Sequence, residues 1–264
     1  MSSKTVDKAL SILDAFTVET PTWGLRELAR NLDMNHTIVH RILATFEEKG
    51  YLYINPETKK YELGIKFIEL NNVVEEHLNI STMIQPIMKE IALETGESVA
   101  LTILDEMEGV FVKIVESEQK VRFAESVGKR SPLYIGASHK VILAYLPEEI
   151  QHKIIDDGLN NKVKYIKSKA ELLDRLKKIK EEGWCYSEGE TFDDVAACSV
   201  PLFDGKSQIL GSLSIAGPKY RFSREQSEEM LPVLKENVVK LNSILSKLNF
   251  PSRRSYFTKN LITS

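Results

Sequence analysis

The sequence of 264 residues lacks several features that define common classes of protein. It contains only two cysteines, Cys185 and Cys198, so it can form neither a disulfide framework nor a four-cysteine zinc site. It has no run of about 18 apolar residues, which excludes a membrane-spanning helix, and its first residues do not resemble a secretory signal. These absences predict a cytoplasmic protein with reduced thiols.

An excess of positive charge, which nucleic-acid-binding domains usually have, is also missing. The net charge is −3, and residues 1–64 carry eight Lys or Arg against nine Asp or Glu. Only residues 251–264 are clearly basic, with three Lys or Arg and no acid, and we expect them to form a flexible tail. Any DNA binding must therefore depend on a local face of the molecule.

The motifs of common catalytic, cofactor and metal sites are missing as well. The chain has no GxSxG, GxGxxG or CxxC. Gly205-Lys206-Ser207 resembles the end of a phosphate-binding loop, but Val200 stands where that loop needs its first glycine. His36 and His40 have the spacing of metal ligands on a helix, but Thr37 replaces the glutamate of a zinc protease. We expect no cofactor and no metal site.

What the chain does have is a helical N-terminal region with a short hairpin. Apolar residues at helical spacing predict three helices, and aromatic and β-branched residues around a turn at 55–60 predict two strands. The helices are expected at residues 6–16, 25–32 and 35–48, and the strands at 51–54 and 61–63. This order is typical of a winged helix-turn-helix, which we place at residues 4–64.

The third helix has an apolar face and a polar face that carries no acid between Asn35 and Phe46. We expect the polar face to enter a DNA groove, where Arg41 could contact a guanine edge or a phosphate; the alternative is an ion pair with Glu47 or Glu48. The candidate DNA-binding residues are Asn35, His36, Thr37, His40 and Arg41, with Lys59 and Lys60 at the tip of the hairpin. Lys4 and Lys8 of the first helix could add contacts to the DNA backbone.

The remainder of the chain is predicted as a linker followed by a mixed α and β domain. Residues 65–79 form a helix with an apolar stripe of Phe67, Leu70, Val74 and Leu78, which could pack on a second copy or on the next domain. Residues 80–250 alternate helices with strands. The strands are expected at residues 98–104, 110–115, 199–203 and 209–216. One helix is expected to end near residue 96, and four more are expected at residues 138–146, 147–157, 168–182 and 223–248.

Several segments, in this order and at this spacing, resemble the IclR family of bacterial transcriptional regulators. They are KALSIL at 8–13, LRELA at 25–29, VHRIL at 39–43, PET at 56–58, GASHKVILA at 136–144 and SLSIAGP at 212–218. The resemblance implies an α+β chain with an N-terminal winged helix-turn-helix and a C-terminal GAF-like effector-binding domain with an antiparallel sheet. It also implies dimers or dimers of dimers, double-stranded DNA with an inverted-repeat operator, and a small organic acid as effector.

The chain departs from the family pattern at three places. The third helix opens with Asn35-His36-Thr37 instead of Ser-Thr, and the hairpin tip has Lys59-Lys60 instead of Gly-Arg. No glycine lies between Glu190 and Gly205, where the family usually has one. The acidic residues at 188–194 are more typical of a solvated loop than of a metal site.

The effector site is predicted from two segments. Alternation along residues 209–216 places Ser212 and Ser214 on one face, where they could line a cavity or pack tightly. Gly136-Ala137-Ser138 begins a helix, whose free N–H groups favour a carboxylate, and the family has effector contacts in both segments. Phe123, Val127 and Cys198 are further candidates, although Cys198 could equally be a small core residue.

These observations favour a sequence-specific DNA-binding regulator, a repressor rather than an activator, that responds to a small organic acid. The first alternative is a small-molecule-metabolising enzyme with an accessory helical domain. The second is an architectural DNA-binding protein whose sensor domain is inactive.

Overall fold

The computed structural model describes residues 3–161 and 168–247, so the predicted tail at 251–264 lies outside the described part. The chain divides into two compact units, residues 1–77 and 78–264. Within the described ranges, no helix has the length and apolar character needed to cross a membrane.

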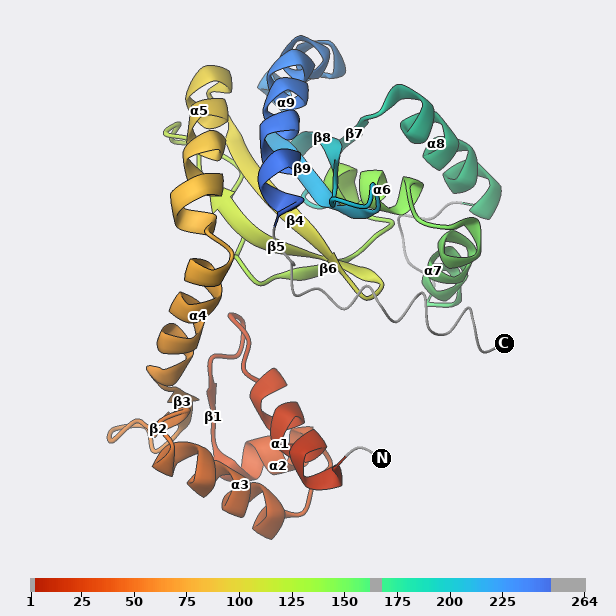
Figure 1. Cartoon of the computed structure of the whole chain (residues 1–264). Helices are drawn as coiled ribbons and strands as arrows, with labels where there is room; N and C mark the ends of the chain where they lie inside the picture. The colour runs from red at the N-terminus through yellow and green to blue at the C-terminus, as the bar shows by residue number, and fades with distance from the viewer. Residues whose placement is uncertain (1–2, 162–167, 248–264) are drawn as a thin grey trace. The chain divides into compact units, whose positions relative to one another are not determined.

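The first unit is a winged helix-turn-helix, as predicted (Figure 1). Its helices are α1 (Lys4–Asp14), α2 (Leu25–Asn31), α3 (His36–Glu48) and α4 (Lys66–His77). Its sheet has the order β1-β3-β2 and consists of β1 (Thr22–Trp23), β2 (Leu52–Ile54) and β3 (Tyr61–Leu63). The sequence predicted β2 and β3 as a hairpin and missed β1, which pairs with β3.

Local chemistry sets where α3 begins and how it packs. The Asn35 side chain accepts a hydrogen bond from the Thr37 N–H (2.9 Å), which satisfies one of the free donors of the first turn. Val39 and Leu43 are fully buried with Ile12 and Leu28 in the core of this unit. Burial of that face leaves the polar face of α3 exposed.

The second unit is built on a six-stranded antiparallel sheet with the order β6-β5-β4-β9-β8-β7. The strands are β4 (Ser98–Asp105), β5 (Glu108–Val115), β6 (Arg130–Pro132), β7 (Cys185–Glu188), β8 (Val195–Phe203) and β9 (Ile209–Pro218). The helices are η1 (Ile80–Ile84), α5 (Gln85–Thr95), α6 (Gly136–Ala144), α7 (Glu148–Asn160), α8 (Lys169–Glu182), η2 (Lys219–Arg221) and α9 (Arg224–Leu245).

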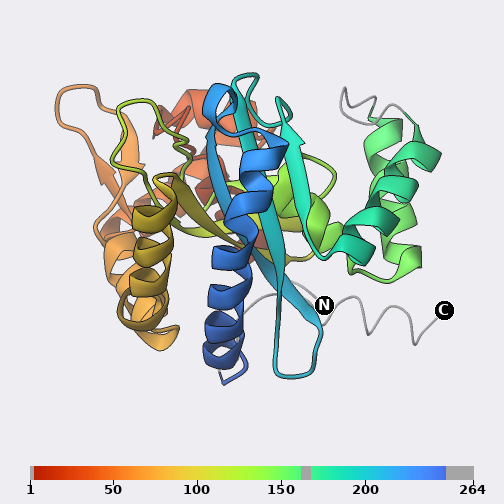
Figure 2. The same cartoon turned by 90° about the horizontal axis from the view of Figure 1, so that it is seen from above.

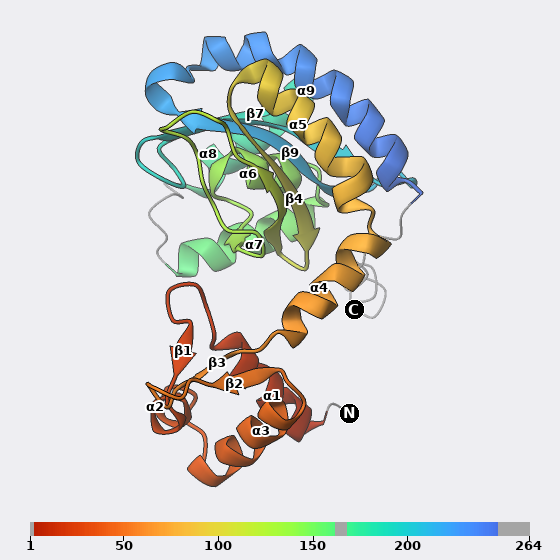
Figure 3. The ribbon, with the colours of Figure 1, turned by 90° about the vertical axis from the view of Figure 1, so that its left-hand side faces the viewer.

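Helices cover both faces of this sheet. Helices α5 and α9 lie side by side on one face (Figures 2 and 3), where Leu213 and Ile215 of β9 pack with Leu234 and Leu241 of α9. Helix α6 lies on the other face and forms a second core with α7 and α8. The two layers follow from the alternation of side chains along each strand.

Three strand assignments differ from the sequence-based expectation. The short edge strands β6 and β7 were not expected, and β8 begins at Val195 instead of Ser199. Edge strands of three or four residues carry too little alternation to be recognised in a sequence, because their pairing is decided by the neighbouring strand.

Candidate DNA-binding surface and effector cavity

The predicted DNA-binding residues of α3 are open to solvent. Asn35, His36, Thr37, His40 and Arg41 are all exposed. The predicted alternative for Arg41 does not occur, because Glu48 pairs with Lys49 and Arg41 forms no ion pair with a described residue. The polar face of α3 is therefore available to a ligand.

The two lysines at the hairpin tip differ from each other. Lys59 is exposed and has a positive φ of 57° in the turn. Lys60 instead forms an ion pair with Glu27 (Nζ to Oε2, 3.0 Å). A hydrogen bond from the Gly24 N–H and the contact with Lys60 both lower the pKa of Glu27. The wing thus presents Lys59 freely, while the charge of Lys60 is partly neutralised.

In the second unit, a small cavity of about 30 Å³ lies between α6 and the sheet. Its lining consists of Ala100, Phe111, Phe123, Ala137, Ser138, Ser187, Thr191, Val195, Ala197, Ser214 and Ala216. Four predicted effector residues are among them, namely Phe123, Ala137, Ser138 and Ser214. The lining combines apolar groups with hydroxyls and contains no charged side chain, which suits a weakly polar ligand.

Several lining residues were missed by the sequence analysis. Ala100 pairs with Ser214 across β4 and β9, and Ala197 pairs with Ala216 across β8 and β9. Residues that pair across neighbouring strands share a face of the sheet, so knowledge of the strand pairing would have placed both alanines on the face of Ser214. Ser187 lies on β7, a strand that the sequence did not reveal.

The two serines of β9 have different surroundings. The Ser214 hydroxyl lies 2.6 Å from the Ser199 hydroxyl and at the cavity wall. The Ser212 hydroxyl is fully buried and donates a hydrogen bond to the Ser138 carbonyl oxygen (2.8 Å). Ser212 therefore fastens α6 to the sheet and does not line the cavity.

Cys198 does not line the cavity either. It is fully buried in the core that faces α5 and α9, while its neighbour Ala197 faces α6 and reaches the cavity. Alternation along β8 separates the two residues onto opposite faces. Burial raises the pKa of the Cys198 thiol to about 12, so it behaves as the small core residue of the alternative interpretation.

The expected carboxylate site at the start of α6 is filled by the chain itself. The Gly136 N–H donates to Glu190 Oε2 (2.9 Å), and Glu190 also pairs with Lys140 and with Arg175 (Nη1 to Oε1, 3.1 Å). Burial opposes ionisation of Glu190, but Lys140 and Arg175 hold its pKa below the usual value. Glu190 is thus part of a partly buried ion network, whereas Asp193 and Asp194 of the same acidic segment are exposed, as expected. Gly136 contacts Glu190 instead of the cavity.

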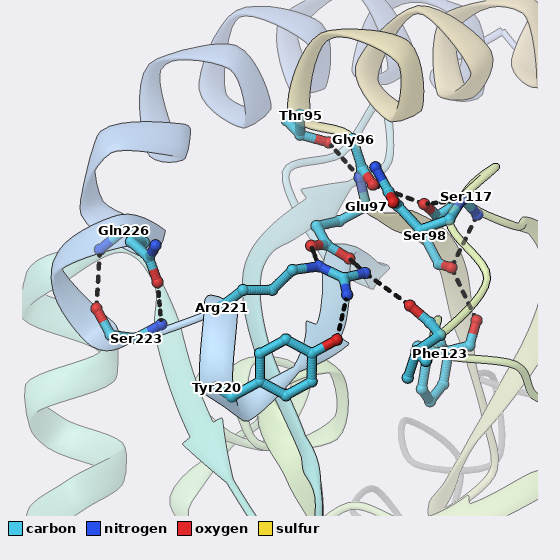
Figure 4. Close-up of polar contacts among 12 residues, drawn as sticks. Thr95, Gly96, Glu97, Ser98, Ser117, Phe123, Tyr220, Arg221, Ser223 and Gln226 are labelled. Atoms are coloured by element: carbon cyan, nitrogen blue, oxygen red, sulfur yellow. Dashed lines mark hydrogen bonds and ion pairs between the residues drawn. The ribbon is translucent and has the colours of Figure 1, made fainter.

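Phe123 is held in place by a hydrogen-bond network at one end of the sheet (Figure 4). The Ser98 hydroxyl donates to the Phe123 carbonyl oxygen (2.8 Å) and accepts from the Ser117 N–H (3.0 Å). Arg221 donates from Nη2 to the Val121 carbonyl oxygen (2.7 Å) and from Nε to Glu97 Oε1 (2.6 Å). These bonds attach residues 117–129, between β5 and β6, to the first residues of β4 and to η2.

A second segment, residues 189–194 between β7 and β8, meets the first one at the cavity. The Phe192 ring packs edge-on against Phe123, with centroids 6.3 Å apart, and the Lys129 ammonium lies 5.7 Å from the Phe192 centroid. Thr191 from the same segment lines the cavity. We call residues 117–129 and 189–194 the cover segments, because each contributes to the cavity wall from outside the regular elements.

His139 is a buried neighbour of the cavity that the sequence analysis missed. Its Nδ1 lies 2.8 Å from the Ser138 hydroxyl, and its ring packs edge-on against Phe111 at 5.4 Å. Burial lowers the pKa of His139 to about 4, so the imidazole is neutral at pH 7. The Ser138 hydroxyl of the cavity is therefore oriented by a neutral ring.

Comparison with known proteins agrees with this architecture. The chain matches the family model "Bacterial transcriptional regulator IclR C-terminal" over residues 73–243 and the model "IclR helix-turn-helix domain" over residues 5–56. The HTH-type transcriptional regulator KipR of Bacillus subtilis is 34% identical over 242 residues, which are 89% of this chain and 93% of KipR.

Two solved structures are similar in fold. An IclR transcriptional regulator from Alicyclobacillus acidocaldarius is 24% identical, with a TM-score of 0.83 over 92% of this chain and 99% of that chain. An IclR homologue from Microbacterium hydrocarbonoxydans, complexed with 4-hydroxybenzoate, is 18% identical, with a TM-score of 0.78 over 92% of this chain and 99% of that chain.

The matched relatives are transcriptional regulators and not enzymes, which removes the alternative of a metabolic enzyme. The helix-turn-helix of residues 5–56 makes DNA the partner of the first unit. The chain therefore belongs to the IclR family of DNA-binding transcriptional regulators.

Proposed function

We propose that this regulator is a repressor whose binding to an inverted-repeat operator is modulated by a small organic acid in the cavity between α6 and the sheet. The observation that carries the proposal is the lining, in which hydroxyls lie among alanines, Val195 and two phenylalanines around a small cavity beside two cover segments. The complex of a similarly folded relative with 4-hydroxybenzoate supports this ligand class.

The size of the cavity suggests how a ligand would act. A volume of about 30 Å³ is far below the about 300–1,000 Å³ of typical ligand pockets. A ligand with a ring therefore has to displace the cover segments, and it binds the displaced arrangement better than the closed one. Such differential binding is what shifts a regulator between two states.

The operator symmetry requires two copies of the chain. Of the predicted stripe, Phe67 packs edge-on against Tyr51 and Leu78 is buried in the core of the second unit. Leu70 and Val74 are exposed on α4, with Val73 exposed beside them, and the helix itself has no buried residue. We propose that this apolar face packs on the same face of a second copy, which corresponds to the first of the two alternatives for the linker helix. We also infer a cytoplasmic location, because the regulator acts on the chromosome.

The proposal can be tested with a duplex selected in vitro from a random-sequence library. Binding is measured by fluorescence anisotropy with and without 4-hydroxybenzoate and a panel of other monocarboxylic acids, together with the melting temperature. An effector should lower the affinity for the selected duplex and, at 100 times its Kd, stabilise the protein by about 2.7 kcal/mol.

A variant that fills the cavity separates the two roles of the chain. Ala197→Leu should retain DNA binding and lose the response to the acid, while Ala170→Leu, at an exposed position of α8, should retain both. A panel that changes neither the melting temperature nor the affinity would contradict the effector role. Failure to select any duplex would contradict sequence-specific binding.

A further inference from the structure

A groove of about 470 Å³ lies between α1 and α3. Its lining consists of Lys4, Thr5, Lys8, Ala9, Ile38, Arg41, Ile42, Thr45 and Phe46. It is much larger than the cavity of the second unit and lies entirely within the first unit. The effector role does not account for it.

The groove gathers three positive charges and no acid. Lys4 and Lys8 are one turn apart on α1, and Arg41 faces them from α3. Within residues 3–161 and 168–247, none of these three side chains forms a hydrogen bond or an ion pair, in contrast to Lys60, which pairs with Glu27. The cations repel each other unless an anion lies between them.

The groove also divides the exposed surface of α3 into two strips. Ile38, Arg41 and Thr45 line the groove beside α1. Thr37 and His40 are exposed but do not line it, because at 100° per residue they lie farther around the helix. Arg41 is therefore at the border of the surface that α3 would present to base edges.

We propose that the α1–α3 groove holds the phosphates of one DNA strand next to the major groove, and that Arg41 contacts a phosphate and not a base. This inference deepens the DNA-binding role and rests on it. Ile38, Ile42 and Phe46 form apolar walls, which strengthen the attraction between the cations and a phosphate. The reading of bases then falls to Asn35, Thr37 and His40.

The salt dependence of DNA binding tests this assignment. Each phosphate contact contributes about −0.9 to the slope of log K against log of the salt concentration. In a dimer, Arg41→Gln and Lys8→Gln should therefore each make the slope shallower by about 1.8 on an unrelated 30-base-pair duplex. Lys177→Gln, at an exposed site on α8, is the matched control and should leave the slope unchanged.

The ratio of affinities for a selected and an unrelated duplex separates a phosphate contact from a base contact. Arg41→Gln should weaken both duplexes equally and preserve the ratio, whereas Thr37→Ala or His40→Ala should lower the ratio about tenfold. An unchanged slope, or a ratio that falls in Arg41→Gln, would overturn the inference while DNA binding by the unmodified protein stands. If the unmodified protein binds neither duplex at low salt, the DNA-binding role itself fails. Circular dichroism melting of each variant confirms that it is folded.

Discussion

At the scale of single residues, alternation along a strand decides which side chains reach the cavity. Of the two serines predicted on β9, only Ser214 lines the cavity, while Ser212 donates a hydrogen bond to α6. On β8, Ala197 lines the cavity, whereas the predicted Cys198 faces the opposite core. Cys198 was chosen by residue type, which does not report the face of a strand. Ser212 lies on the face that alternation predicted, but its hydroxyl is bonded to the Ser138 carbonyl oxygen.

His139 predicts a specific dependence of stability on pH. Its folded pKa of about 4 lies below the value of 6.5 for an exposed histidine, so the unfolded chain binds more protons between these values. The stability that His139 contributes is therefore complete above pH 6.5 and is lost as the pH falls toward 4. The loss amounts to about 3 kcal/mol, because one pKa unit corresponds to about 1.4 kcal/mol.

This dependence is measured by urea unfolding of the unmodified protein and His139→Gln at several pH values between 4 and 7. The unmodified protein should lose more stability than the variant as the pH is lowered, and the difference should level off above pH 6.5. The carboxylates titrate in the same way in both proteins, so they do not contribute to the difference between the two curves. Parallel curves for the two proteins would show that His139 is not buried in its neutral form.

At the scale of elements, the long amphipathic segments were predictable and the short paired ones were not. The sequence predicted α2, α3 and the hairpin because their apolar residues follow a helical or alternating period over several residues. Strands β1, β6 and β7 have two to four residues, and their positions depend on tertiary pairing. The cover segments have no regular period, and of their residues only Phe123 and Val127 were named as effector candidates; Val127 is exposed and does not line the cavity.

The network around Arg221 predicts that one side chain controls the mobility of a cover segment. Arg221→Gln removes the bonds to Glu97 and to the Val121 carbonyl oxygen. Hydrogen bonds of a charged group contribute about 1.5–3 kcal/mol, so amide hydrogen exchange over residues 117–129 should become about 10- to 150-fold faster.

Exchange is measured by mass spectrometry on the full chain. Arg224→Gln is the matched control, because Arg224 pairs with the exposed Glu182 and Glu228 and does not touch a cover segment. If residues 189–194 also exchange faster in Arg221→Gln, the contact between Phe123 and Phe192 links the two segments. Equal exchange in the variant and the unmodified protein would refute control by Arg221.

At the scale of the whole molecule, the exposed apolar face of α4 predicts how the chain assembles. Val74 is 48% exposed on a helix that buries no residue of its own. Val74→Glu should shift the protein from dimer to monomer, because a carboxylate in a packed apolar interface is costly to desolvate. It should also weaken binding to a selected palindromic duplex, which two linked copies bind together.

Light scattering after size-exclusion chromatography reports the mass, and anisotropy reports the binding. Val18→Glu is the control, since Val18 is 76% exposed outside the helices and strands of the first unit. A dimer that persists in Val74→Glu would place the interface elsewhere on the chain.

The small volume of the closed cavity also bears on the sensitivity of the regulator. If only a fraction of molecules has the cover segments displaced, the apparent Kd equals the intrinsic Kd divided by that fraction. In the proposed response to an effector, substitutions of residues that hold the cover segments, such as Arg221 or Phe192, would then change the concentration at which the regulator responds. Substitutions there would adjust the threshold of gene control while both the ligand contacts and the DNA contacts stay unchanged.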